Sequence, residues 1–392
     1  MTSKERMLTS IENLKADHIP CSFMLFSALC DQYMNELDYI DKQIAMGIDP
    51  KVELHKLPLR FHKDVTIKEY METEPDGTKL IVKEYHTPKG LLTQRVKHSF
   101  DWSYGRHIPL LNDHIITRSD KFIATSENDL EALEYLFLPP SDVDIAMFRA
   151  GADELKKFAD QRGLLVSGGW RYDRAPDSNE GEHANYGNMG FDALSWLCGM
   201  EKLLMLTYDN PTFVERLVDI VAGWNRKRLE IELDAGPDLI LRRGWYESAD
   251  IISPDIYRKY VVPHLREDIK MAHQAGVKFG YIITSGIAPL IGELLALDID
   301  VILGIDPLTA GCGLKKIKET LGSRMCLWGG VSGSLTVERG GEENVRKAVE
   351  DCMSMLGENG GFILSPVDNI TEDTPESREN IRTFLETWKA LR

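Results

Sequence analysis

The stretch from Gly236 to Thr374 carries five short apolar segments: PDLILRRGWYE (237–247), VKFGYIITSG (277–286), DVILGIDP (300–307), RMCLWGGVSG (324–333) and GGFILSPVDN (360–369). Amphipathic segments of helical character separate them, such as YRKYVVPHLREDIKMAHQAG (257–276) and EENVRKAVEDCMSMLGENG (342–360). Strands that alternate with helices, without hairpin turns between them, are parallel and joined by crossover helices. The strands are also apolar throughout, as expected for a parallel sheet, because helices cover both of its faces.

Three further strand candidates precede these five, at about Ile19–Leu25, Val52–His55 and GLLVSGGW (163–170). Eight strands with intervening helices predict an α/β fold, a (β/α)8 TIM barrel that spans 1–392 as a single domain. The alternative is an open doubly wound sheet. That alternative lacks support, since no GxGxxG follows a strand and no Walker-type phosphate loop is present.

One segment has a different character. The residues VTIKEYMETEPDGTKLIVKEYHTPKGLLTQRVKH (65–98) alternate between apolar and polar and contain Pro-Asp-Gly and Pro-Lys-Gly turns. This pattern predicts an antiparallel β-meander of three strands. We therefore expect an insertion over 60–160, with the meander at about 65–98 followed by helices, outside the barrel wall.

The composition excludes some classes of partner. Net charge is −16, from 62 acidic and 46 basic side chains, which argues against a nucleic-acid partner because phosphate binding needs a basic face. No apolar run approaches the roughly 18 residues that span a bilayer, so no membrane helix is expected. The charged N-terminal segment lacks an apolar signal core, which predicts a cytoplasmic protein. The six cysteines lack metal-ligand spacing and are expected to be free thiols.

Candidate site residues lie where the predicted strands end, because chemistry in barrels gathers at the C-terminal ends of strands. Two arginines, two aromatic residues and an acid follow one strand directly, and such a group can hold an aromatic or carboxylated substrate. The candidate substrate-binding residues are Trp170, Arg171, Tyr172, Arg242, Arg243, Trp245, Tyr246, Thr284, Ser285 and Trp328; the candidate catalytic carboxylates are Glu247, Asp306 and Asp368.

Each candidate has a structural alternative. Glu247 is the strongest candidate for an acid, a base or a metal ligand, but it can instead form an ion pair with an arginine that caps the barrel. Asp306 can cap the next helix, and Trp328 can pack in the core. Thr284 and Ser285 can bond to a substrate oxygen or simply stabilise a turn. Glu247 and Asp368 are also the two candidate metal ligands.

Several of these segments resemble the uroporphyrinogen decarboxylase superfamily, and particularly its methyltransferase-like branch. The matching segments are GMEKLLMLTYDNPTFVERLVD (199–219), SPDIYRKYVVPHLREDIKMAHQAG (253–276), DVILGIDP, LKKIKETLG (314–322), LWGGVS (327–332) and GGFILSPVDN. Enzymes of that branch pass methyl groups between methanol, methylamines or aryl ethers, corrinoid proteins and thiol or folate acceptors. The resemblance covers about 163–392 well and implies a barrel with its site at the C-terminal mouth. It also implies a homodimer.

The chain departs from both patterns of that superfamily. Its zinc-dependent thiol methyltransferases carry a His-x-Cys pair where Ile283 and Ser285 stand here, and a further Cys near the position of Asp368. No thiolate-type zinc site is therefore expected. Uroporphyrinogen decarboxylases carry an N-terminal arginine-rich segment and an essential Asp nearby, whereas the matching segment HIPCSFMLFSALCDQY (18–33) has no arginine.

The resemblance implies an enzyme that passes a methyl group from a small methylated or methoxylated compound to a corrinoid on a partner protein. Glu247, helped by Asp306 or Asp368, would protonate the leaving atom directly or through a metal. One alternative is decarboxylation of a porphyrinogen-like or other carboxylated substrate whose acids are held by Arg242 and Arg243. Another is a non-catalytic barrel that only binds a small molecule.

Overall fold

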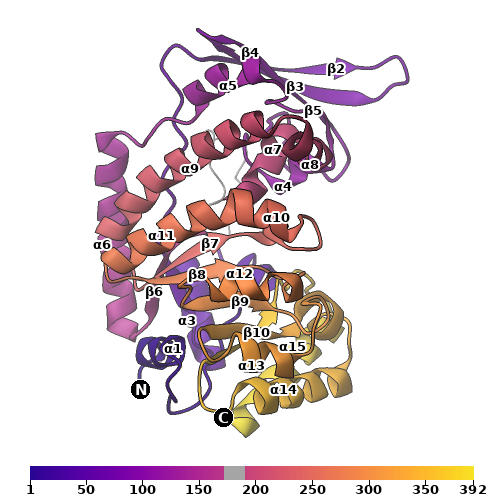
Figure 1. Cartoon of the computed structure of the whole chain (residues 1–392). Coiled ribbons are helices and arrows are strands. Elements are labelled where there is room, and N and C mark those ends of the chain that lie inside the picture. The colour runs from indigo at the N-terminus through magenta and orange to yellow at the C-terminus, as the bar shows by residue number, and fades with distance from the viewer. Residues whose placement is uncertain (172–189) are drawn as a thin grey trace.

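The computed structural model of the chain describes residues 1–171 and 190–392, and a parallel sheet of seven strands lies at its centre (Figure 1). The strands are β1 (Lys51–Glu53), β6 (Leu165–Gly169), β7 (Leu239–Arg243), β8 (Lys278–Ile282), β9 (Val301–Ile305), β10 (Cys326–Ser332) and β11 (Phe362–Val367). They follow one another in the sheet in sequence order, and every neighbouring pair is parallel. The predicted alternation of parallel strands and helices is confirmed.

The predicted first strand, Ile19–Leu25, lies beside β11 but does not form a regular strand. Cys21 and Leu25 make isolated parallel bridges with Leu364 and Asn369. The ladder is interrupted because side chains take the places of backbone partners. Met24 N–H donates to Ser365 Oγ (2.8 Å), and Cys21 N–H donates to Asp49 Oδ2 (3.1 Å). The described residues thus form a curled seven-stranded sheet with an eighth segment at one edge, and the prediction of a closed eight-stranded barrel is confirmed only to that extent.

The α-helices of the described residues are α1 (Ser3–Ile11), α2 (Ser27–Cys30), α3 (Glu36–Met46), α4 (Asp113–Ile116), α5 (Glu127–Leu133), α6 (Asp142–Arg162), α7 (Leu194–Cys198), α8 (Met200–Asp209), α9 (Pro211–Asp234), α10 (Pro254–Ile256), α11 (Val262–Gln274), α12 (Ile291–Leu295), α13 (Leu314–Thr320), α14 (Glu342–Leu356) and α15 (Pro375–Leu391). Helices such as α9, α11 and α14 pack on the outer face of the curled sheet, whereas α4 and α5 belong to the insertion. The long α6 begins at a capping box formed by Ser141 and Asp144 and ends at Gly163, whose φ of 62° suits glycine.

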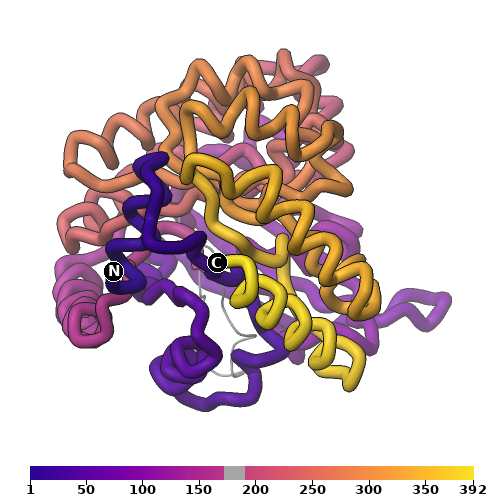
Figure 2. The backbone as a smooth tube through the Cα atoms, turned by 90° about the horizontal axis from the view of Figure 1, so that it is seen from below, coloured from indigo at the N-terminus to yellow at the C-terminus, as the bar shows by residue number. Residues whose placement is uncertain are grey.

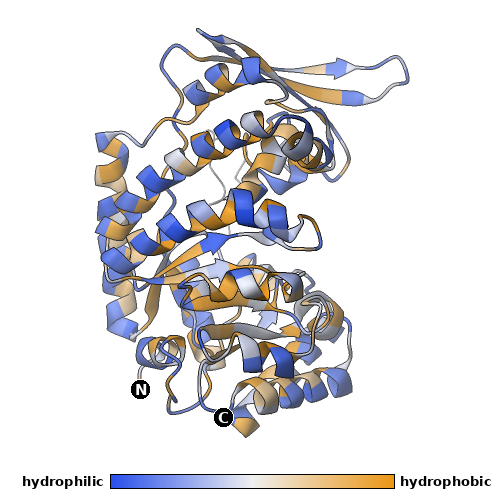
Figure 3. Cartoon of the chain, in the orientation of Figure 1, coloured by the Kyte–Doolittle hydropathy of each residue, from blue (hydrophilic) through white to orange (hydrophobic). Residues whose placement is uncertain are grey.

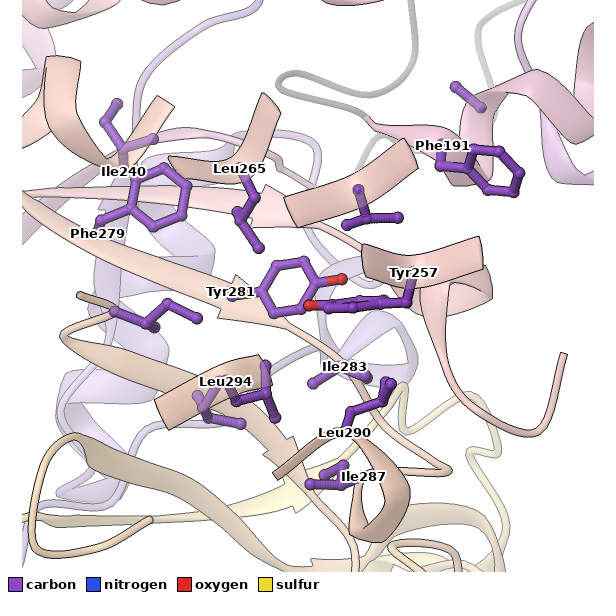
Figure 4. Close-up of a cluster of buried hydrophobic side chains, with 14 of the residues drawn as sticks. Phe191, Ile240, Tyr257, Leu265, Phe279, Tyr281, Ile283, Ile287, Leu290 and Leu294 are labelled. Atoms are coloured by element: carbon purple, nitrogen blue, oxygen red, sulfur yellow. The ribbon is translucent and has the colours of Figure 1, made fainter. Parts of the chain in front are cut away.

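The core has two layers. Inside the curl, side chains from facing strands pack together, among them Leu165, Leu241 and Leu303, and α1 closes this cluster with Met7 and Ile11. Between the sheet and the helices lies the larger cluster, part of which Figure 4 shows between β7, β8 and α11. Hydrophobic colouring accordingly follows the strands, and polar colouring follows the outward faces of α9 and α11 (Figure 3).

The insertion forms a separate antiparallel sheet, visible at the top of Figure 1. Its strands lie in the order β2 (Thr66–Thr73), β3 (Lys79–Thr87), β4 (Gly90–Lys97) and β5 (Ser119–Lys121). The three predicted strands are confirmed. The fourth strand was missed because it has three polar residues, too few for an alternating pattern. A small hydrophobic cluster that includes Ile81, Val96 and Trp102 covers one face of this sheet.

The two ends of the chain meet. Trp388 Nε1 on α15 donates to Ile19 O (2.9 Å), and Lys389 Nζ reaches Met46 O (2.7 Å). Figure 2 shows the N-terminal segment and α15 side by side. The six cysteines form no disulfide, as predicted. Among the described helices, none has both the length and the apolar character that crossing a membrane requires.

One buried acid gives the fold a pH dependence. Glu232 on α9 is 3% exposed and accepts a hydrogen bond from Gly169 N–H (2.8 Å). Burial raises the pKa of Glu232 from 4.5 to about 7. The folded protein therefore holds this proton more tightly than the unfolded chain does. The stabilisation is fully present below pH 4.5 and is lost as the pH rises through 7.

We expect the free energy of unfolding of the Glu232→Gln variant to exceed that of the wild type at about pH 8. The amide keeps the acceptor for Gly169 N–H but cannot ionise. Between about pH 5 and pH 8 the wild type should lose about 2 kcal/mol more than the variant. Urea denaturation of both proteins across this range measures the difference. Equal slopes with pH would show that Glu232 does not titrate there.

Candidate functional site

Glu247 and Arg242 form a buried ion pair where β7 ends. The turn after this strand folds Glu247 back onto it, and Arg242 Nη1 and Nη2 lie 3.2 and 3.3 Å from Glu247 Oε2 and Oε1. Tyr281 on β8 donates its hydroxyl to Glu247 Oε2 (2.5 Å), and Phe191 N–H donates to Oε1 (2.6 Å). Neither charged side chain is more than 1% exposed. Figure 4 shows the rings of Tyr281 and Tyr257 side by side.

Both oxygens of Glu247 thus already accept hydrogen bonds from protein groups. This is the arrangement expected if Glu247 is a structural ion-pair partner of an arginine. Arg242 is engaged as well, since its Nε lies 3.4 Å from Asp268 Oδ2 on α11. Burial raises the pKa of Asp268 to about 6. The chain approaches this cluster closely at Gly190, where a Cβ atom would lie 1.8 Å from Arg242 Nη2. A role for Glu247 as acid, base or metal ligand remains a prediction that this geometry does not favour.

Arg243 sits in a box of aromatic rings. Its guanidinium carbon lies 4.7 Å from the Trp196 ring centre, 4.9 Å from Trp245 and 5.1 Å from Tyr246. Its Nη2 contacts both oxygens of Asp113, at 2.9 and 3.0 Å. The guanidinium is 1% exposed, so this box holds a cation of the protein itself rather than an open place for a ligand.

Two acids of this cluster were not predicted from the sequence. Asp113 lies on α4 of the insertion, and Asp192 follows the undescribed residues 172–189. Asp192 Oδ2 lies 3.4 Å from Arg243 Nη1, and burial raises the pKa of Asp192 to about 7. No motif marks either acid. Their partner Arg243 is 130 and 51 positions away along the chain, so only the fold brings them together.

Two predicted carboxylates lie at the C-terminal ends of their strands. Asp306 follows β9, is 6% exposed and accepts a hydrogen bond from Leu308 N–H (2.8 Å), so it also forms the local turn foreseen as its alternative role. Asp368 follows β11 and is exposed, with a left-handed backbone φ of 68°. Surrounding protein atoms displace water around both carboxyl groups and raise the pKa of each, although the Asp368 side chain still reaches solvent, and neighbouring carboxylates add to the effect at Asp368. Each acid therefore keeps its proton to a higher pH than an ordinary aspartate does, which a general acid requires.

The remaining predicted residues divide into core and rim. Trp328 is fully buried and donates its indole N–H to Ser22 O (2.8 Å), in agreement with its core-packing alternative. Trp170 is also buried and packs edge-to-face on Trp245, with ring centres 5.0 Å apart. Thr284 and Ser285 are partly exposed, and Ser285 Oγ lies 3.2 Å from Ser248 Oγ. Tyr172 lies outside the described residues.

A cavity of about 310 Å³ opens in the seam between the eighth segment and β1. Across this seam, Asp49 N–H donates a hydrogen bond to Cys21 O (2.7 Å). The cavity is lined by Phe23, Met24, Leu25, Phe26, Cys30, Met34, Glu36, Tyr39, Ile40, Gln43, Lys51, Glu53 and Arg171. Of the predicted site residues, Arg171 lines this cavity, where it pairs with Glu36 (2.9 Å).

The cavity combines an apolar wall with paired charges. Aromatic, methionine and aliphatic side chains form most of the wall. The acids Glu36 and Glu53 pair with Arg171 and Lys51 respectively, so the lining carries no net charge. Such a cavity suits a small, largely neutral molecule. No motif marks this cavity, because its walls come from segments that are individually ordinary core sequence.

The described part of the chain contains no group of three or more His, Cys, Asp and Glu side chains arranged to hold a metal ion. Glu247 and Asp368 remain untested as metal ligands.

The family model described as Uroporphyrinogen decarboxylase (URO-D) matches residues 188–391. A solved structure described as a methyltransferase from Methanosarcina mazei superimposes with a TM-score of 0.59 at 16% sequence identity, covering 100% of this chain and 99% of that one. At this identity the likeness shows the fold alone.

A sugar phosphate isomerase/epimerase from Parabacteroides distasonis reaches a TM-score of only 0.39 at 11% identity, over 95% of this chain and 96% of that one, too low to support an argument. No curated protein matches the sequence.

Proposed function

Because the chain belongs to the uroporphyrinogen decarboxylase family, we propose that it is a methyltransferase that passes a methyl group from a small methylated or methoxylated compound to a corrinoid protein. The observation that carries this choice is the pair of carboxyl groups, Asp306 and Asp368, whose pKa values are raised at the strand ends. A proton donor at that place serves the release of an oxygen or nitrogen leaving group.

The engagement of both arginines argues against the decarboxylase alternative. Arg242 contacts Glu247 and Asp268, and Arg243 contacts Asp113 and Asp192. Each guanidinium is buried and faces two carboxylates. Binding of substrate carboxylates needs cations that are free to pair. A substrate without acid groups fits this charge distribution better.

In the proposed reaction the corrinoid is the acceptor substrate and supplies the nucleophile. The chain's own contribution is to position the methyl donor and to protonate the atom that loses the methyl group. Asp368 is the better donor of the two acids because its side chain is exposed to solvent. Asp306 is buried and holds a turn.

We assign the methyl donor to the seam cavity. Leu25 lines the cavity, and its backbone pairs with Asn369, the residue after Asp368. Ile370 N–H donates to Leu25 O (3.3 Å) and fixes the same loop. The cavity wall and the loop that carries the proposed acid are therefore joined through the backbone, although Asp368 itself is not among the residues that line the cavity.

The test combines the purified protein, a reduced corrinoid and a panel of methylated and methoxylated compounds. Spectroscopic detection of the methylated corrinoid, dependent on enzyme and donor, would support the proposal. Carbon dioxide release from carboxylated substrates would support the decarboxylase alternative instead. A compound that binds tightly but is converted by neither assay would indicate the non-catalytic binding barrel.

We expect Gln43→Leu to raise KM for the methyl donor by about tenfold with little change in kcat. Gln43 lines the cavity, and its side chain makes no hydrogen bond to the described residues, so its amide is available to a ligand. The loss of one hydrogen bond is worth about 1.4 kcal/mol, or a factor of about ten. Steady-state kinetics measure the split. Gln161→Leu, at an exposed position on α6, is the matched control and should leave KM unchanged.

A further inference from the structure

Strand β2 presents an open edge. It is the first strand in the sheet order β2-β3-β4-β5, so its other side has no strand beside it. Six of its eight residues, including Ile67 and Tyr70, are exposed. An exposed edge of this length is a template for pairing with another strand. Glu72 makes no ion pair within the described residues, and Lys68 lies opposite Glu84, whose oxygens contact Tyr70 and His86, so both charges can pair with a neighbour.

A second copy of the same strand can pair with this edge only in certain registers. In antiparallel pairing, residues directly opposite each other point their backbone groups the same way, either both toward or both away from the partner. Along β2, every second residue directs its backbone N–H and C=O groups toward the open edge, and these are the same residues in both copies. A twofold-symmetric pair must therefore place some residue opposite its own copy, and registers centred between two residues are excluded.

The register centred on Tyr70 is complementary. It places Lys68 opposite the partner's Glu72 and Glu72 opposite the partner's Lys68, so that two ion pairs flank a central pair of tyrosines. Opposite charges and aromatic pairs facing each other across strands are both stabilising. The side chain of Tyr70 is held in place on its own sheet by a hydrogen bond to Glu84 Oε1 (3.0 Å).

The neighbouring registers are worse. Centring on Lys68, Glu69 or Glu72 sets a charge against its own copy, which is destabilising. Centring on Met71 pairs Lys68 with Glu74, but Glu74 already contacts Arg95 (2.6 Å). That register also places Pro75 opposite Ile67, and proline lacks the N–H that a ladder needs.

We propose that the chain forms a twofold-symmetric homodimer in which β2 of each protomer pairs antiparallel with β2 of its partner, centred on Tyr70. The two four-stranded sheets then form one continuous sheet of eight strands, and the open edge disappears. This inference is independent of the proposed methyl transfer, since it involves no residue of the candidate site. Failure of either proposal leaves the other standing.

The first measurement is the molar mass of the full chain by light scattering and sedimentation. It is made up to about 100 µM, where an interface with a Kd in the micromolar range is saturated. We expect twice the chain mass for the wild type. We expect the mass of one chain for Lys68→Glu, which sets two acids against each other on each side of the centre, and for Glu72→Lys, which does the same with two lysines. Lys121→Glu, on the opposite edge strand β5, is the matched control and should remain dimeric.

Mixing the two monomeric variants gives the decisive result. Opposite the Glu72→Lys protomer, the Lys68→Glu protomer restores an acid facing a lysine at both positions, so a one-to-one mixture should recover the mass of two chains. Circular dichroism confirms that each variant is folded. A monomeric wild type, a Lys68→Glu variant that stays dimeric, or a mixture that fails to associate would each overturn the proposal.

Discussion

Replacing Glu247 by glutamine is expected to lower the free energy of unfolding by about 3–5 kcal/mol. The buried Glu247 carboxylate accepts hydrogen bonds from the Arg242 guanidinium, the Tyr281 hydroxyl and Phe191 N–H. A glutamine offers one acceptor oxygen and turns an NH2 group toward these donors. It also leaves the positive charge of Arg242 without its hydrogen-bonded partner, and an uncompensated buried charge is among the costliest single changes. Urea denaturation at neutral pH measures the loss.

The matched control for this change is an exposed ion pair. Arg149 and Asp234 lie 3.1 Å apart with more than half of each side chain exposed, so Asp234→Asn should cost less than about 1 kcal/mol. A Glu247→Gln enzyme with unchanged stability and turnover reduced by about a hundredfold or more would contradict the ion-pair role. That result would indicate that Glu247 acts as an acid or base in the reaction.

Replacing Asp368 by asparagine is expected to reduce turnover by a factor of about a hundred or more, with stability nearly unchanged. Asparagine has almost the same shape and tolerates the left-handed backbone at this position, where φ is 68°. Only the capacity to carry and release a proton is removed. The side chain is exposed, so no buried contact is lost.

The pH dependence gives a second readout. The wild-type rate should fall as the pH rises through the raised pKa of Asp368, because a general acid acts in its protonated form. The variant should lack this limb of the profile. Asp306→Asn is the control, since asparagine preserves the acceptor for Leu308 N–H. If Asp306→Asn instead abolishes turnover and Asp368→Asn does not, the acid is Asp306.

The fold was largely predictable because its pattern is local. Each strand from β7 to β11 is an apolar run followed by polar residues, so it can be recognised from its own sequence. Crossover helices then leave little freedom in the order of the parallel strands. The eighth segment is different. It reads as a strand, but Ser365 and Asp49 supply side-chain partners where a ladder would use carbonyl groups. Which partner a backbone N–H finds is decided by residues hundreds of positions away.

The site was predictable only in part, for the same reason. Glu247 lies five residues from Arg242, so both the ion pair and its functional alternative could be foreseen from the sequence. Asp113 and Asp192 could not, because neither stands in a recognisable motif and both reach Arg243 through the fold. The seam cavity could not be predicted either, because residues from several separate segments line it and no single segment indicates it.

The pairing of the eighth segment with β11 has a consequence for how the protein is made. Met24 finds Ser365 across 341 positions, and Ser27 reaches Ile370 across 343. A ribosome must therefore synthesise the chain as far as Ile370 before these contacts can form. Until then, the apolar segment that contains Phe23 and Leu25 lacks its strand partner. Docking of this edge should be one of the last events in folding, and such distant pairings form slowly. The interval during which the growing chain is vulnerable to aggregation ends only when its two extremities come together.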